Sequence, residues 1–185
     1  MKIRNRKIFM GSNTPDGFIG FHDQIVDAYG LKKLYILKGC SGSGKSTFIK
    51  NFVKTITDNI KTDITVDWII CSADPTSIDG AIIQDIGVGI IDGTFPHITD
   101  PKYPALVDEI IDLGKFININ KVKKSRDELE NLIYQKKSYY KLAYENLDLA
   151  RKKHAEIESA YIPAMNFDEI NKLCDELSAK TVQTK

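Results

Sequence analysis

Arginine is scarce in this chain, although lysine is abundant. The 26 Lys and Arg residues include only four arginines, at Arg4, Arg6, Arg126 and Arg151. Phosphoryl-transfer enzymes often place arginine at the transferred group, so this scarcity disfavours an enzyme that closes several arginines over phosphates. The formal net charge of +1 gives no bulk electrostatic reason to expect nucleic acid or an anionic membrane as a partner.

Long apolar runs are also missing, and cysteine is rare. No apolar segment approaches the roughly 20 residues that a membrane span needs. The basic N-terminus is not followed by the apolar segment of a signal peptide. The three cysteines, Cys40, Cys71 and Cys174, lack the short spacing of metal ligands. We therefore expect a cytoplasmic protein with reduced thiols and no membrane association.

The chain divides into two parts by composition. Residues 1–120 contain glycines, turns and β-branched runs, whereas residues 121–185 contain no glycine and one proline and are rich in Lys, Glu, Leu and Tyr. A chain of 185 residues can form one sizeable core with a small appendage. We predict a nucleotide-binding core in the first part and a helical extension, acting as a lid or a partner-binding arm, in the second.

Apolar strands alternate with helical segments in the first part. Strands are predicted at 34–38, 64–71 and 88–91, and helices at 21–29, 46–60 and 105–113. Residues 116–119 are consistent with a short strand or with the start of the next helix. This alternation predicts an α/β fold in which helices flank a parallel sheet that is buried on both faces.

The second part predicts a helical hairpin. Residues 122–161 contain no helix breaker, and a helix of this length would extend for on the order of 55 Å. Pro163 ends it, and Asn166 with Glu169 resembles the capping box of a last helix at 167–179. Residues 181–185 are expected to fray. Such a hairpin either packs on the sheet or projects toward a partner.

The segment between the first core strand and the next helix matches the phosphate-binding pattern Gly-x-x-x-x-Gly-Lys-Ser/Thr in full. We call residues 39–47 the glycine-rich loop. Its members are Gly39, Cys40, Ser41, Gly42, Ser43, Gly44, Lys45, Ser46 and Thr47. Glycines let backbone N–H groups approach phosphate oxygens, and the following helix adds the positive end of its dipole. Lys45 supplies a charge to the β- and γ-phosphates, Ser46 offers a hydroxyl to Mg²⁺, and Thr47 adds a contact to the α-phosphate.

A carboxylate at the end of a neighbouring strand usually completes such a site. Asp92 follows the apolar residues 88–91 and is predicted to hold Mg²⁺ through water, although Asp92-Gly93 is also a common turn. Asp74 and Asp79 follow the second strand and are candidates to position a water or an acceptor hydroxyl, or else simply turn residues. His97 either senses the γ-phosphate or polarises a water, or it is simply a solvent-facing loop residue. His22 and His154 are expected to be ordinary surface or helix-face residues.

The sequence favours ATP over GTP as the nucleotide. The guanine-reading pattern Asn-Lys-x-Asp is nearly present at 120–123, but Lys123 replaces the aspartate that would bind the guanine edge. The Ser-Gly-Gly motif of ABC-type ATPases is absent from the sequence as well. The expected cofactors are therefore ATP and Mg²⁺.

Several segments together resemble a family of poorly characterised bacterial P-loop ATPases, sometimes described as nucleotide-kinase-like. The resemblance covers residues 9–180 and is carried by the glycine-rich loop and by residues 14–18, 71–75, 77–80, 91–94, 96–97, 100–104 and 107–110. It implies that Asp74, Asp79, Asp92 and His97 surround the nucleotide. Family members usually contain two tandem P-loop halves, and this chain resembles the N-terminal half, which implies a homodimer or a partner that supplies the second half.

Three functions fit these features. The first is an ATPase that uses ATP binding or hydrolysis as a conformational switch, with the long helix as its lever. The second is a small-molecule or nucleotide kinase whose residues 121–161 form a lid. The third is a nucleotide-binding interaction module with little turnover. The scarcity of arginine favours the ATPase over the kinase, since only Arg126 and Arg151 lie in the would-be lid.

Overall fold

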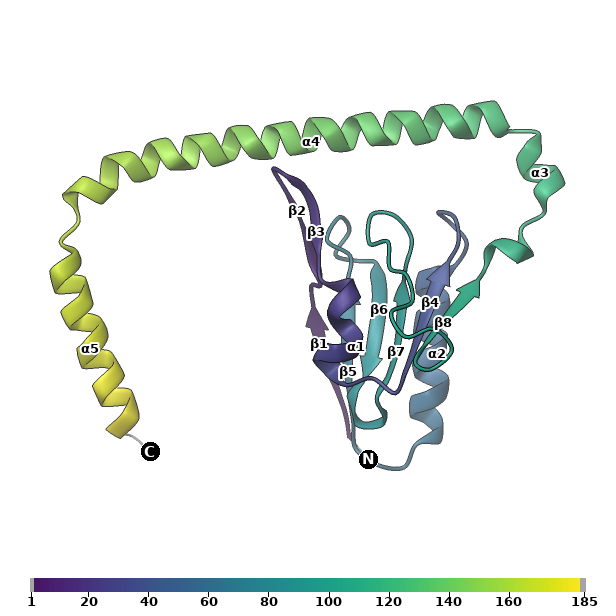
Figure 1. The fold of residues 1–185 in the computed structure, drawn as a ribbon, viewed down its shortest axis with the longest axis horizontal. Helices are drawn as coiled ribbons and strands as arrows, with labels where there is room; N and C mark the ends of the chain where they lie inside the picture. The colour runs from purple at the N-terminus through teal and green to yellow at the C-terminus, as the bar shows by residue number, and fades with distance from the viewer. Residues whose placement is uncertain (1, 184–185) are drawn as a thin grey trace.

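The computed structural model describes residues 2–183. It has an α/β fold, in which a six-stranded sheet carries helices on both faces and a long helix lies outside this core (Figure 1). The strands are β1 (Ile3–Ile8), β2 (Gly11–Thr14), β3 (Gly17–Gly20), β4 (Lys33–Lys38), β5 (Ile64–Ile70), β6 (Ile78–Ile83), β7 (Val88–Asp92) and β8 (Asp108–Asp112). The helices are α1 (Ile25–Tyr29), α2 (Lys45–Asn59), α3 (Ile119–Lys123), α4 (Arg126–Tyr161) and α5 (Phe167–Gln183). Short 3₁₀ turns are η1 (His22–Gln24), η2 (Gln84–Ile86), η3 (Gly114–Phe116) and η4 (Ile162–Ala164).

The sheet is mostly parallel, with the strand order β1-β5-β6-β7-β4-β8, while β2 and β3 form a separate antiparallel hairpin. Only β6 runs against its neighbours β5 and β7. The prediction of a parallel sheet is therefore correct except at β6. Parallel neighbours need a crossover of a dozen or more residues, and the short links on either side of β6 allow only antiparallel turns.

The sheet is buried on both faces, as predicted. On one face Ile25 and Val26 of α1 pack against β-strand residues such as Ile36. On the other face Ile49 and Val53 of α2 pack against a second set of strand residues. Alternate residues of each strand point to opposite faces, so the continuous apolar runs of β4, β6 and β7 supply both clusters.

The helix predicted at 105–113 is wrong, because this segment contains strand β8. Residues Leu34 to Lys38 of β4 pair with Asp108 to Asp112 in parallel register. Ala105 has a left-handed backbone conformation with φ of 62°, which a helix starting there cannot accommodate. The apolar spacing fits either helix or strand, and pairing with the buried strand β4 decides between them.

Strand β1 was not predicted, because it is a charged edge strand whose residues are mostly exposed. It pairs in parallel with β5. The Arg6 guanidinium donates two hydrogen bonds of 2.6 Å to the fully buried carboxylate of Asp67 on β5. Tyr29 and Gln84 donate to the same carboxylate at 3.0 and 2.7 Å. A network that is buried at Asp67 and half-exposed at Arg6 thus attaches β1 to the sheet.

The long helix is present, but the helical hairpin is not. Helix α4 has 36 residues and passes across the end of the molecule, and α5 turns away from it after η4 instead of folding back along it (Figure 1). Pro163 lies in η4, and the Asn166 side chain accepts a hydrogen bond from the Glu169 N–H, as the capping pattern predicted. Helix α5 continues to Gln183, beyond the predicted end at 179, and residues 184–185 of the predicted frayed end lie outside the described residues. None of the helices within residues 2–183 combines the length and apolarity that crossing a membrane requires.

Helix α4 is attached to the core through the β2–β3 hairpin. The Tyr144 hydroxyl lies 3.1 Å from the Asn13 Oδ1, and the Arg151 guanidinium lies 3.1 Å from the Asp16 carboxylate at the hairpin turn. Arg126, near the start of α4, pairs with Glu130 at 2.7 Å on the exposed surface. Both arginines of the extension are therefore engaged in exposed ion pairs along α4.

Candidate functional site

The glycine-rich loop lies where the sequence places it, between the end of β4 and the start of α2 at Lys45. Gly42 and Gly44 have φ angles of 79° and 84°, which L-residues with side chains rarely adopt. A Cβ atom on Gly39 would lie 2.6 Å from the Ser43 Oγ. The chain therefore needs glycine at these positions to form a tight turn that ends in the first N–H groups of a 15-residue helix.

Lys45 lies over the loop and faces a carboxylate. Its Nζ donates to the carbonyl oxygens of Gly39 and Cys40 at 2.9 and 3.0 Å. The same Nζ is 3.5 Å from Asp92 Oδ2, and both side chains are largely buried. A lysine held in this way places a positive charge beside the backbone N–H groups at the start of α2, which suits an anion with several oxygens.

Asp92 ends β7 directly beside β4, since Leu37 and Asp92 are partners in the parallel ladder. Its Oδ1 accepts hydrogen bonds from the Thr94 N–H at 2.9 Å and from the Thr94 hydroxyl at 2.5 Å. These bonds form the turn that the sequence offered as an alternative, and Oδ2 still faces Lys45. Asp92 therefore forms this turn and at the same time lies beside the glycine-rich loop.

A cavity of about 320 Å³ lies in front of the loop. Its walls come from the loop, from the start of β6 and from the end of β7. The lining residues are Gly42, Ser43, Gly44, Lys45, Ser46, Thr47, Ser77, Ile78, Asp79 and Asp92. Most of the residues predicted from the sequence to bind phosphate and magnesium therefore line one cavity.

Asp79 lies beside Asp92 because β6 is antiparallel, so its first residues reach the edge at which β7 ends. Asp79 and His97 are both buried, and Asp79 Oδ2 is 3.4 Å from His97 Nε2. Burial raises the pKa of the Asp79 carboxyl, and the neighbouring His97 partly opposes that rise. His97 is therefore not a solvent-facing loop residue.

Lys38 fixes the loop that contains His97, a role that the sequence did not reveal. Its Nζ donates to the carbonyl oxygens of Gly93 and Thr99, each at 2.8 Å, and lies 3.5 Å from Asp100 Oδ1. The Thr99 hydroxyl in turn donates to the His97 carbonyl at 3.0 Å. A lysine at the end of a strand gives no local signal of such contacts, which depend on a loop 55 or more residues away.

His22 is buried, and the expectation of an ordinary surface residue is wrong. Its side chain is 5% exposed, and its ring lies 5.1 Å from that of His97, with Phe18 packed against both. Burial, followed by the proximity of His97, lowers the pKa of His22 to about 4. Its segment, predicted as one helix at 21–29, is a 3₁₀ turn followed by α1, and this turn directs the ring inward.

Asp74 does not join this group. Its carboxylate is exposed and accepts hydrogen bonds from the Thr76 N–H at 2.9 Å and hydroxyl at 2.6 Å. The interpretation of Asp74 as a turn residue is therefore the one that the structure supports. His154 is also as expected, because it is exposed on α4, where its Nε2 lies 3.2 Å from Glu158.

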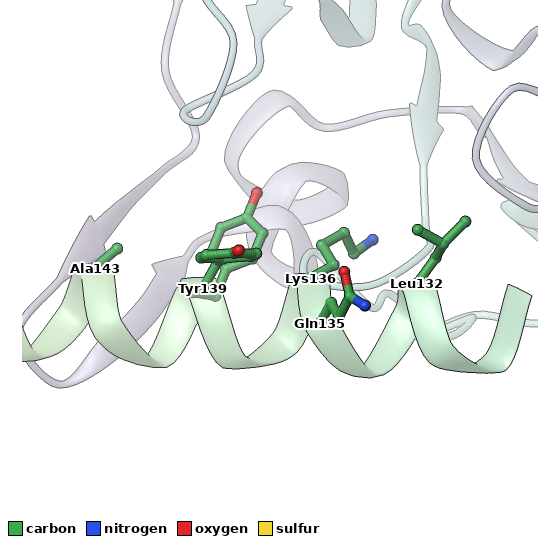
Figure 2. A pocket seen from close by; sticks show the side chains of 6 residues that line it. Leu132, Gln135, Lys136, Tyr139 and Ala143 are labelled. Carbon is green, nitrogen blue, oxygen red and sulfur yellow. The ribbon is translucent and has the colours of Figure 1, made fainter. Parts of the chain in front are cut away.

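A second concave surface lies on α4. It is a groove of about 480 Å³ lined by Leu132, Gln135, Lys136, Tyr139, Tyr140 and Ala143. Figure 2 shows these side chains projecting from the side of α4 on which the rest of the chain lies. No family model, curated protein or solved structure matches this chain, so its function is inferred from these sites alone.

Proposed function

We propose that the chain is a P-loop protein that binds MgATP in the cavity beside the glycine-rich loop. The observation that carries the proposal is the position of Lys45, between the loop carbonyls and Asp92. In the complex the loop N–H groups and Lys45 would bind the phosphates, since backbone N–H groups at a helix start suit phosphate oxygens. Ser46 and Asp92, which line the same cavity, fit a magnesium ion held partly through water.

We further propose that the bound nucleotide is hydrolysed and acts as a switch on α4. Asp79 lines the same cavity as Asp92, and its Oδ2 lies 3.4 Å from His97 Nε2, so this pair is suited to orient a water. His97 touches Phe18 of β3, and the β2–β3 hairpin carries the Asn13 contact to α4. This chain of contacts supplies a route by which the state of the cavity can reach the long helix.

Turnover without an acceptor tests the switch directly. Purified protein with MgATP alone is expected to release inorganic phosphate at a slow, saturable rate, because water is the acceptor in an ATPase. The groove on α4, whose largely apolar lining includes Tyr139 and Tyr140, makes the kinase the second candidate, since an acceptor would have a binding surface there. Phosphate transfer that occurs only after a metabolite pool is added would support the kinase over the switch. Binding without any turnover would leave the third function, a nucleotide-binding module.

The exposed apolar side chains of the helical extension are compatible with a protein partner. Large apolar side chains are exposed along α4 and α5, among them Leu132, Tyr139, Ile157, Leu173 and Leu177. Exposed apolar side chains in such number are typical of an interaction surface. We propose that a second copy of this chain or a separate second half covers it, and light scattering of the purified chain distinguishes a dimer from a monomer.

A further inference from the structure

The side chains of Asp79 and Asp92, which line the cavity, converge with the side chain of His97. Asp79 comes from β6, Asp92 from the end of β7, and His97 from the loop that follows β7. One ligand atom from each lies within 4.8 Å of the other two. The three residues are 7, 9 and 7% exposed, so each is at least nine-tenths buried. Two carboxylates and an imidazole therefore share one small space with little exposure to solvent.

The spacing of these atoms fits direct coordination of a metal ion. Asp79 Oδ2 and His97 Nε2 are 3.4 Å apart. Two ligands that are each about 2.1 Å from a metal and this far apart subtend an angle of about 110° at the metal, close to tetrahedral geometry. Asp92 Oδ1 is occupied by Thr94, which leaves Oδ2 directed at this space and at Lys45.

The imidazole groups supply an independent second observation. His22 is 5% exposed, and its ring lies against that of His97. Both ring nitrogens of His22 and the Nδ1 of His97 are buried without a hydrogen-bond partner among the described residues. Buried polar atoms in proteins are nearly always paired, and a bound ion or water is a common reason for an exception. His97 Nε2 faces Asp79, so the unpaired nitrogens, which are His97 Nδ1 and both nitrogens of the adjacent His22 ring, lie next to the proposed ion and are not its ligands; water bound beside the ion would pair with them.

We propose that Asp79, Asp92 and His97 bind a divalent transition-metal ion, such as Mn²⁺ or Zn²⁺, in the nucleotide-free protein. Imidazole nitrogen favours these ions over Mg²⁺ and Ca²⁺, which prefer oxygen ligands throughout. The site shares Asp92 with the magnesium position proposed above, but it requires neither the glycine-rich loop nor a nucleotide. The ion would offset the charge of two buried carboxylates, of which Asp92 lies beside Lys45 and Asp79 beside His97.

Titration of the nucleotide-free protein with Mn²⁺, followed by the loss of the free Mn²⁺ signal in electron paramagnetic resonance, tests the proposal. One ion per chain is expected to bind with a Kd in the micromolar range. Zn²⁺ should displace it, and millimolar Mg²⁺ should not. His97→Ala and Asp79→Asn are each expected to weaken binding by at least about 10-fold. The matched control is His154→Ala, which removes an exposed histidine beside a carboxylate and should leave the affinity unchanged.

Absence of stoichiometric Mn²⁺ binding, or unchanged affinity in both site variants, would overturn the proposal and leave Asp79 and His97 as an ion pair. Asp79→Asn nearly preserves side-chain volume, so it serves as the test if His97→Ala does not fold. MgATP binding is measured separately on the same proteins. Mn²⁺ binding without ATP binding would contradict the proposed function alone, and ATP binding without nucleotide-free Mn²⁺ binding would contradict the metal site alone.

Discussion

Replacing Lys45 with alanine is expected to weaken MgATP binding by at least about 100-fold, or about 2.7 kcal/mol. Lys45 is the one side-chain cation on the wall of the cavity before the glycine-rich loop, as far as residues 2–183 define it. It is also largely buried, so its charge acts on a phosphate with little screening by water. Losing one partner of such a charge pair typically costs several kcal/mol. Isothermal titration with MgATP measures the effect.

The matched control for Lys45→Ala is Lys50→Ala, which removes an exposed lysine one turn further along α2. That variant should bind MgATP with unchanged affinity. Circular dichroism should show both variants folded, because the Lys45 contacts to Gly39 and Cys40 order the loop and not the sheet. Equal affinities of the wild type and Lys45→Ala would remove the main support for a nucleotide site at this loop.

The second large effect is expected on stability. Asp67→Ala should lower the free energy of unfolding by about 3 kcal/mol, since removing this buried carboxylate leaves its hydrogen-bond donors without their acceptor. Arg6, Tyr29 and Gln84 all donate to this fully buried carboxylate. Asp58→Ala is the control, because its ion pair with Lys54 on α2 is exposed and should contribute less than about 0.5 kcal/mol. Urea denaturation compares the three proteins.

The same carboxylate predicts a dependence of stability on pH. Burial alone would raise the pKa of Asp67, but the hydrogen bonds from Arg6, Tyr29 and Gln84 outweigh it and hold the pKa below its usual value. The unfolded chain therefore takes up the proton first as the pH falls below about 4. Asp67 therefore stabilises the fold fully at neutral pH, and this stabilisation is lost at lower pH. The difference in the free energy of unfolding between wild type and Asp67→Ala should shrink there. A difference in the free energy of unfolding that stays constant down to pH 2 would contradict this account of the network.

Local signals explain why the positions of the glycine-rich loop and of Asp92 in the fold could be predicted from the sequence. The glycine-rich loop is encoded within nine consecutive residues, and its conformation depends on Gly42 and Gly44 themselves. Asp92 was placed correctly because parallel neighbours end at the same edge of a sheet, and β7 pairs with β4. In these cases the chemistry and the geometry are carried by the same short segment.

Long-range pairing explains the errors. The segment at 105–113 has apolar spacing that suits a helix, yet its pairing with β4 makes it strand β8. The burial of His22 depends in part on His97, which is far from it in the chain. The hairpin predicted for the extension required contacts between α4 and α5, and periodicity within each helix cannot specify contacts between them. Periodicity did identify α4 itself, because 36 residues without a breaker leave few alternatives.

A crystal structure with Mg²⁺ and a non-hydrolysable ATP analogue tests the central claim most directly. We expect the phosphates to lie on the N–H groups of residues 42–47, with Lys45 Nζ at the β- and γ-phosphates and Mg²⁺ between Ser46 and Asp92. An analogue bound elsewhere, or a cavity at the glycine-rich loop that stays empty at saturating analogue, would contradict the proposal that this loop binds MgATP.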